Sequence, residues 1–71
     1  MYDEKQRLCK NISYLRKTHD LSKKEMAQLL GISISALNRI EQGELPSRLS
    51  ISILFRIQTH FRVSPFEELE E

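Results

Sequence analysis

Few residues in this sequence have the types and spacing that catalysis or metal binding requires. His19 and His60 are isolated and lack ligand spacing, so we interpret both as surface histidines. Cys9 has no neighbouring histidine and adjoins an apolar stripe of a predicted helix, which favours a small packed residue over a nucleophile. A single cysteine also excludes an internal disulfide. We therefore expect no enzyme, no catalytic residue, no metal site, no cofactor and no small-molecule ligand.

The charged residues are unevenly distributed, although the net charge is only +1. Residues 1–48 carry nine Lys and Arg against six Asp and Glu, whereas residues 49–71 carry two against four. Any basic face must therefore lie in the first two thirds of the chain. The sequence has neither a signal peptide nor an apolar run of membrane-spanning length. We expect a cytoplasmic protein without membrane contact, and the length predicts one domain over residues 1–71.

The spacing of apolar residues and helix caps predicts a compact all-α fold of five short helices. Each predicted helix follows a side chain that can accept a backbone hydrogen bond: Asp3, Ser22, Ser33, Ser50 and Ser64. The first helix buries Leu8, Ile12 and Leu15 and ends near Thr18. ISISAL alternates like a strand, but the glycines on either side bracket it at helical length, so we interpret it as helix. The residues predicted to be buried on the fourth helix are Ile51, Leu54, Phe55, Ile57 and Phe61.

The segment from Lys23 to Gly43 contains two short helical patterns separated by three residues. Ala27 is small enough for two helices to cross steeply, and Gly31 suits a turn that needs a positive backbone angle. The apolar residues that would hold both helices on one core are Met26, Leu30, Ile32, Leu37 and Ile40. The outer face of the second of these helices is left free, and the major groove of DNA, about 12 Å wide, admits one helix. The pattern therefore predicts a helix that is presented rather than buried.

These features resemble the Cro and phage-repressor type of helix-turn-helix DNA-binding domain, the XRE family. The matching residues are LRKTHDLSKKEMAQLLGISISALNRIEQG, and the later segment ILFRIQTHFRVSPFEEL is similar to the last two helices of that family. The resemblance covers nearly the whole chain. It implies a five-helix repressor-like domain with the helix-turn-helix at helices 2 and 3. It also implies sequence-specific binding of duplex DNA by a transcriptional regulator.

The resemblance implies that the turn and the recognition helix read bases through Ser33, Ile34, Ser35, Asn38 and Arg39. Arg39 could pair with guanine, Asn38 could pair with adenine, and Ile34 could meet a thymine methyl group. A solvated helix face is the alternative interpretation for Arg39 and Asn38. The family often has a polar residue at the position of Ile34, so packing on the protein or on a protein partner is the alternative there.

The resemblance also implies contacts to DNA phosphates from Ser22, Lys23, Lys24, Ser47 and Arg48. Lys23 stands where the family commonly carries Gln, and a helix N-terminus adds backbone amides and a favourable dipole. For the other four, an ordinary cap or surface charge is the alternative. Glu44 lies where a cation is more usual, which would shift backbone binding toward Arg48.

Two further expectations follow from the resemblance. Arg16 and Glu41 are expected to form an ion pair that joins the first helix to the end of the third. Phe66 and Leu69 on the fifth helix either complete the core or form a two-fold contact in a homodimer. A rival function remains open: a protein-interaction module on the same fold, such as an antitoxin or adaptor. The near-neutral charge, Ile34 and Glu44 favour it.

Overall fold

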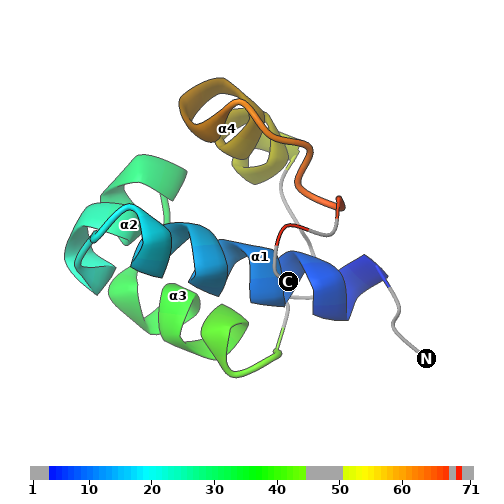
Figure 1. Cartoon of the computed structure of the whole chain (residues 1–71). Coiled ribbons are helices and arrows are strands. Elements are labelled where there is room, and N and C mark those ends of the chain that lie inside the picture. The colour runs from blue at the N-terminus through cyan, green and yellow to red at the C-terminus, as the bar shows by residue number, and fades with distance from the viewer. Residues whose placement is uncertain (1–3, 45–50, 68, 70–71) are drawn as a thin grey trace.

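The computed structural model describes residues 4–44, 51–67 and 69, and this part of the chain contains four α-helices. They are α1 (Glu4–Thr18), α2 (Lys23–Leu30), α3 (Ile34–Glu41) and α4 (Ile51–Phe61). Figure 1 shows α1 crossing the middle of the molecule, with α3 on one side of it and α4 on the other. The described residues include no strand, so the all-α prediction is confirmed. None of the described helices is long and apolar enough to cross a membrane.

The two central helices begin and end where the sequence predicts. Ser22 accepts a hydrogen bond from the backbone N–H of Glu25 and donates its own backbone N–H to the Glu25 carboxylate, which completes a capping box. Ser33 caps α3 by accepting from the N–H of Ala36 at 3.0 Å. Gly31 ends α2 with φ of 74°, a left-handed conformation that is costly for residues with a side chain. The predicted caps Asp3 and Ser50 lie outside the described residues.

The core is formed by the inner faces of all four helices. Its buried apolar residues are Leu8, Cys9, Ile12, Leu15, Met26, Ala27, Leu30, Leu37, Ile40, Ile53 and Ile57. Full burial of one large aliphatic side chain contributes about 1.5–3 kcal/mol. Since α2 and α3 are only eight residues long, this shared burial rather than helix propensity stabilises them. Cys9 is buried, in agreement with its interpretation as a packed residue.

On α4 the prediction of the buried face was partly wrong. Ile53 and Ile57 face the core, whereas Ile51 is 80% exposed and Phe55 is 64% exposed. Ile57 was in the predicted set, but Ile53 was not. Apolar residues occur on nearly every side of this helix, so their spacing alone is compatible with more than one buried face. The packing of α4 against α2 selects the face that carries Ile53 and Ile57.

The predicted fifth helix is not confirmed, because the described residues Ser64–Glu67 form a single turn. The physical reason is Asn11, a buried polar residue on the apolar face of α1. Its side-chain amide donates to the carbonyl of Pro65 at 2.8 Å and to that of Glu67 at 2.5 Å. Both carbonyls therefore satisfy a buried amide, which ties this turn to α1. Phe66 and Leu69 are partly buried against the core, which favours the first of their two interpretations.

Candidate nucleic-acid interface

The turn between α2 and α3 is closed by backbone hydrogen bonds. The N–H of Ile32 donates to the carbonyl of Ala27 at 2.9 Å, and the N–H of Gly31 donates to that of Gln28 at 3.2 Å. This is the Schellman arrangement, in which a left-handed glycine lets the chain satisfy the last carbonyls of a helix. Ala27 is buried close to this turn. The turn therefore fixes the direction in which α3 leaves α2.

A side chain from α4 also holds this turn. The Arg56 guanidinium donates from Nη1 to the carbonyl of Leu29 at 3.3 Å. The same guanidinium lies so close over Gly31 that an added Cβ would be 3.2 Å from its Cζ atom. A cation at this place also suits the negative end of the α2 dipole. The position of α3 is thus supported from α4 as well as from α2.

The outer face of α3 exposes most of the side chains that the resemblance assigned to base reading. Ser33, Ile34, Ser35 and Arg39 are exposed. Leu37 and Ile40 point the other way and are fully buried, which holds the helix on the core. This arrangement supplies one cation, two hydroxyl groups and one apolar side chain on a solvent-facing helix. Such groups can donate to base edges or contact a thymine methyl group.

Asn38 differs from its neighbours because it is only half exposed. Its Oδ1 atom is buried and has no hydrogen-bond partner among the described residues. A bidentate contact to adenine uses both the carbonyl and the amino group of the side chain. In this rotamer the carbonyl oxygen does not reach solvent, so such a contact requires rotation of the Asn38 side chain.

The predicted phosphate-contacting residues that the structure describes lie at the start of α2. Lys23 and Lys24 are exposed there, and the Ser22 hydroxyl accepts the capping hydrogen bond from the backbone N–H of Glu25. The hydrogen bonds from the backbone N–H and then the hydroxyl of Ser22 lower the pKa of Glu25, so this first turn also carries a firmly ionised carboxylate. Ser47 and Arg48 lie outside the described residues.

Arg16 and Glu41 join α1 to the end of α3 through a two-pronged ion pair. Arg16 Nε donates to Glu41 Oε2 at 2.7 Å, and Nη2 donates to Oε1 at 3.0 Å. The two side chains are only 16% and 11% exposed. Arg16 also donates from Nη1 to the carbonyl of Leu21 at 3.3 Å. The hydrogen bond to Glu41 raises the pKa of Arg16 above its already high ordinary value.

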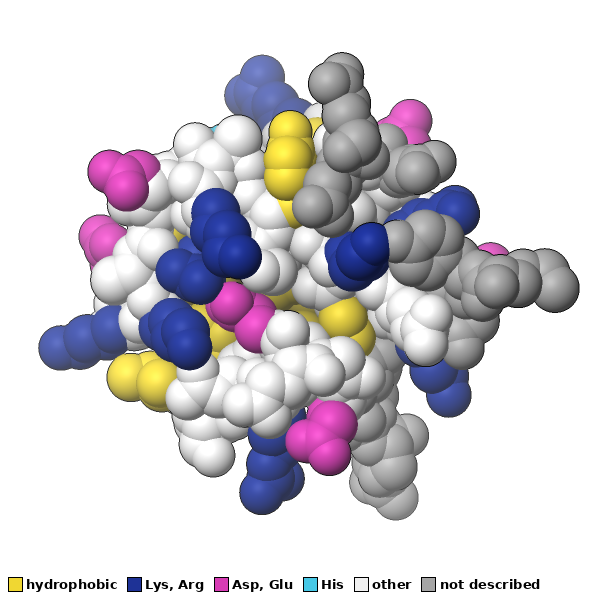
Figure 2. All heavy atoms as spheres, turned by 60° about the horizontal axis from the view of Figure 1, so that its bottom comes forward, with side chains coloured by type: hydrophobic (Ala, Val, Ile, Leu, Met, Phe, Trp, Pro, Cys, Tyr) yellow, Lys and Arg dark blue, Asp and Glu magenta, His cyan; other side chains and the backbone are white. Residues whose placement is uncertain are grey.

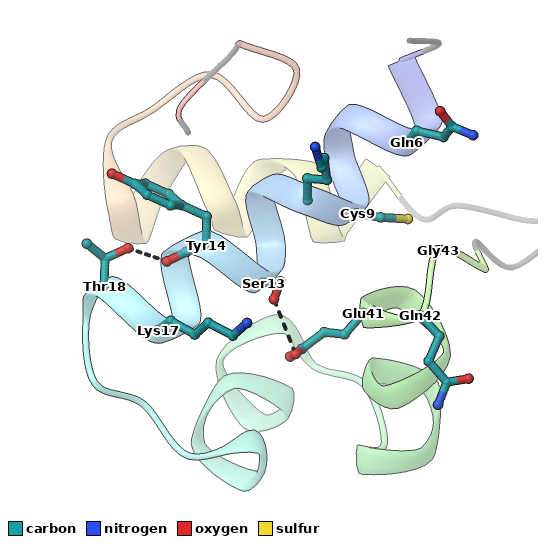
Figure 3. A pocket seen from close by; sticks show the side chains of 10 residues that line it. Gln6, Cys9, Ser13, Tyr14, Lys17, Thr18, Glu41, Gln42 and Gly43 are labelled. Atoms are coloured by element: carbon teal, nitrogen blue, oxygen red, sulfur yellow. Dashed lines mark hydrogen bonds between the residues drawn. The ribbon is translucent and has the colours of Figure 1, made fainter. Parts of the chain in front are cut away.

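A groove beside this ion pair was missed by the sequence reasoning. It has a volume of about 800 Å³ and lies between α1 and the end of α3 (Figure 3). Its polar lining includes Gln6, Lys10, Ser13 and Lys17 from α1, and Glu41 and Gln42 from the end of α3. The α1 residues recur at spacings of four, three and four, which places them on one face of a helix. The spacing of this polar stripe is visible in the sequence and could have indicated the groove. It lies beside the apolar stripe from which the buried face of α1 was predicted.

The groove and the exposed side of α3 belong to the same half of the molecule. Figure 2, which turns the α3 side of Figure 1 forward, shows Lys and Arg side chains gathered around a carboxylate near the middle of this face. A local basic surface therefore exists in a chain whose net charge is only +1. A basic face of this kind attracts polyanions although the whole chain is nearly neutral.

His19, one of the two histidines, packs against other parts of the protein. The His19 ring lies edge-on to Phe61, with ring centres 4.8 Å apart, and its Nδ1 is 3.0 Å from the Leu15 carbonyl. Within residues 4–44, 51–67 and 69, the structure contains no group of three or more His, Cys, Asp or Glu side chains that could hold a metal ion.

The fold and this surface define a helix-turn-helix protein, and comparison with known sequences agrees. A profile of the helix-turn-helix family matches residues 12–67, and the chain belongs to this XRE-type family, whose members are DNA-binding regulators. One similar protein is the antitoxin PezA of Streptococcus pneumoniae serotype 4 (strain ATCC BAA-334 / TIGR4), 46% identical over 55 residues. That alignment covers 78% of this chain but 34% of PezA, so the chain spans about a third of the relative's length. No solved structure matches the chain.

Proposed function

We propose that this chain binds duplex DNA sequence-specifically and acts as a transcriptional regulator of repressor type. The observation that carries the proposal is the outer face of α3, which exposes Ser35 and Arg39 while Leu37 and Ile40 fix the helix on the core. In this mechanism α3 enters the major groove and Arg39 donates to a guanine edge. Lys23, at the first position of α2, contacts a phosphate and sets the register of the protein on the duplex.

The test is a selection of random duplex DNA against the purified chain at two salt concentrations. We expect one enriched sequence. Arg39→Ala should relax the preference at a single base pair by about 1–3 kcal/mol of discrimination. Lys23→Ala should weaken binding to all duplexes alike and reduce the dependence of affinity on salt. Enrichment of no sequence, or an unchanged preference for Arg39→Ala, would contradict the base-reading role.

The second candidate function is that of a protein-interaction module on the same fold. Exposed apolar side chains favour it: Ile34 is 45% exposed on α3, and Ile51 and Phe55 are exposed on α4. An exposed apolar side chain such as Ile34 also suits a protein interface, where a partner would remove it from water. The similarity to a protein named as an antitoxin is compatible with this function.

A photo-crosslinking amino acid in place of Ile34 separates the two functions directly. If α3 reads DNA, irradiation in the presence of the enriched duplex should attach the chain to a base in that duplex. If α3 is a protein interface, irradiation in cells should instead give a single protein adduct at position 34, and none when the same group replaces Gln28 on α2. The second outcome, together with a selection that enriches nothing, would replace the first function by the second.

A further inference from the structure

Arg56 on α4 contacts the turn between α2 and α3 in three ways. Because α2 has no basic residue in its own last turn, the cation at the negative end of its dipole comes from α4. The hydrogen bonds that close the turn end on the two preceding carbonyls, and the carbonyl of Leu29 accepts from Arg56 Nη1 at 3.3 Å. The guanidinium also covers Gly31, since its Cζ, Nη1 and Nε atoms lie 3.2–3.5 Å from the place of a Cβ there. One side chain from outside the helix-turn-helix therefore completes its turn.

This turn controls the end of α3 that is proposed to read bases. Only three residues join α2 to α3, and the last of them, Ser33, is the cap of α3. The exposed residues Ile34 and Ser35 follow directly, and recognition helices contact base edges mainly through their N-terminal residues. The other end of α3 is held on α1 by the ion pair with Arg16. A change in the turn therefore moves mainly the base-reading end of the helix.

The helix that carries Arg56 lies away from the face proposed to meet DNA. Figure 1 shows α3 and α4 on opposite sides of α1. The packing of α4 on α2, with Ile53 and Ile57 buried, fixes the guanidinium at the turn. We propose that Arg56 is a positioning residue for base reading: it holds the turn in the orientation in which α3 enters the major groove, without touching DNA itself. This inference rests on the proposed DNA-binding function and adds α4 to the elements that determine its specificity.

A small displacement of α3 is enough to weaken base reading. Binding groups must be held within about 0.5 Å of their productive positions, and hydrogen bonds weaken steeply when their angles change. Without the guanidinium the turn can adopt other orientations, and the apparent affinity for the specific duplex falls with the fraction that remains competent. Phosphate contacts carry no sequence information, so binding to an unrelated duplex depends less on this orientation. Loss of the Arg56 contact should thus reduce discrimination between duplexes rather than the general attraction to DNA.

The experiment compares Arg56→Met with the matched control Arg62→Met, both in the full chain, on the duplex enriched by the selection and on a scrambled duplex. Both changes remove an exposed guanidinium on α4 or directly after it, but of these two arginines only Arg56 donates to the turn. Relative to the control, Arg56→Met should bind the enriched duplex about fivefold more weakly, the factor that one ordinary hydrogen bond contributes. Binding to the scrambled duplex and the slope of log affinity against log salt should be the same for both variants.

A second measurement, made without DNA, follows the orientation of α3 directly. Residual dipolar couplings of the backbone amides report the angle between α3 and α1; they should change in Arg56→Met and stay unchanged in Arg62→Met. Equal discrimination by the two variants would overturn the positioning role. So would a salt slope lower by about 0.9 in Arg56→Met, because Arg56 would then contact a phosphate. If the unaltered chain enriches no duplex, the proposed function fails, and the couplings still decide whether Arg56 orients α3.

Discussion

The ion pair between Arg16 and Glu41 should contribute far more than an ordinary surface salt bridge, and its magnitude can be worked from the geometry. Exposed pairs contribute about 0.2–1 kcal/mol. This pair has two charge-assisted hydrogen bonds of 2.7 and 3.0 Å, and the side chains are only 16% and 11% exposed. Hydrogen bonds to charged groups contribute about 1.5–3 kcal/mol. We therefore expect a coupling free energy of about 1.5–3 kcal/mol between the two residues.

The perturbation is a double-mutant cycle of Arg16→Met, Glu41→Met and the double variant, followed by urea unfolding at 25 °C. Arg16→Met should cost about 2–4 kcal/mol, because it leaves a largely buried carboxylate without its partner. The double variant should cost less than the sum of the single variants by the coupling free energy. A 71-residue domain has roughly 4–11 kcal/mol of unfolding free energy. The single variants should therefore still fold, although with a small margin.

Two controls make the cycle decisive. Arg16→Lys keeps the charge but cannot form the two-pronged contact, so it should lose part of the coupling. Lys5→Met, on the exposed side of α1, should change stability by no more than about 0.5 kcal/mol. The coupling should also persist in high salt, since a largely buried pair is screened weakly. A coupling in the range of exposed pairs that disappears on addition of salt would refute the argument.

Four further predictions concern the elements that hold the interface. Gly31→Ala should destabilise the fold by about 1–2 kcal/mol in urea unfolding, because φ is 74° and the new methyl group crowds the guanidinium from α4. Glu25 has a pKa lowered below 4.5 by its N-cap serine, so its contribution to stability is present above pH 4.5 and lost as the pH falls through the lower folded-state pKa. In Glu25→Gln the unfolding free energy, measured as a function of pH, should no longer show this acid-dependent loss. An unchanged pH profile would contradict the role given to Glu25. Asn11→Ala should cost about 1–3 kcal/mol and make the C-terminal segment sensitive to protease, since the buried carbonyl of Pro65 and the part-buried carbonyl of Glu67 lose their donor. Phe55→Ser should change stability by no more than about 0.5 kcal/mol, whereas Ile57→Ala should cost about 2–5 kcal/mol; equal costs would contradict the described orientation of α4.

Local signals in the sequence predicted the helix-turn-helix well because each acts within a few residues. The caps Ser22 and Ser33 and the left-handed Gly31 depend on backbone geometry over three to five positions, and all three lie where they were expected. The predicted base-reading residues of α3 are exposed apart from Asn38, which is half buried, because the same spacing that buries Leu37 turns most of the intervening residues outward.

The errors arose where the outcome depends on contacts between distant parts of the chain. The buried face of α4 is determined by its packing on α2. The sequence of a helix with apolar residues on most sides does not indicate which of those sides will be buried. The fifth helix is not confirmed, and the turn described at Ser64–Glu67 is bonded to Asn11, more than fifty residues away in sequence. The groove was not predicted, because the apolar stripe of α1 indicates only the buried face of this helix, whereas Lys10 and Lys17 lie on its polar stripe.

On α3 the residues that hold the helix on the core are different from those that face solvent, and this separation affects how the domain can change over evolutionary time. Leu37 and Ile40 supply the burial that holds the helix, and the Ser33 hydroxyl supplies its cap. Ile34, Ser35 and Arg39 contribute to neither, so substitutions there alter folding free energy by no more than about 0.5 kcal/mol each. Selection can therefore vary the outward-facing residues almost freely without risking loss of the fold. A library randomised at these three positions should consist mostly of folded proteins, which makes the domain a ready scaffold for new target preferences.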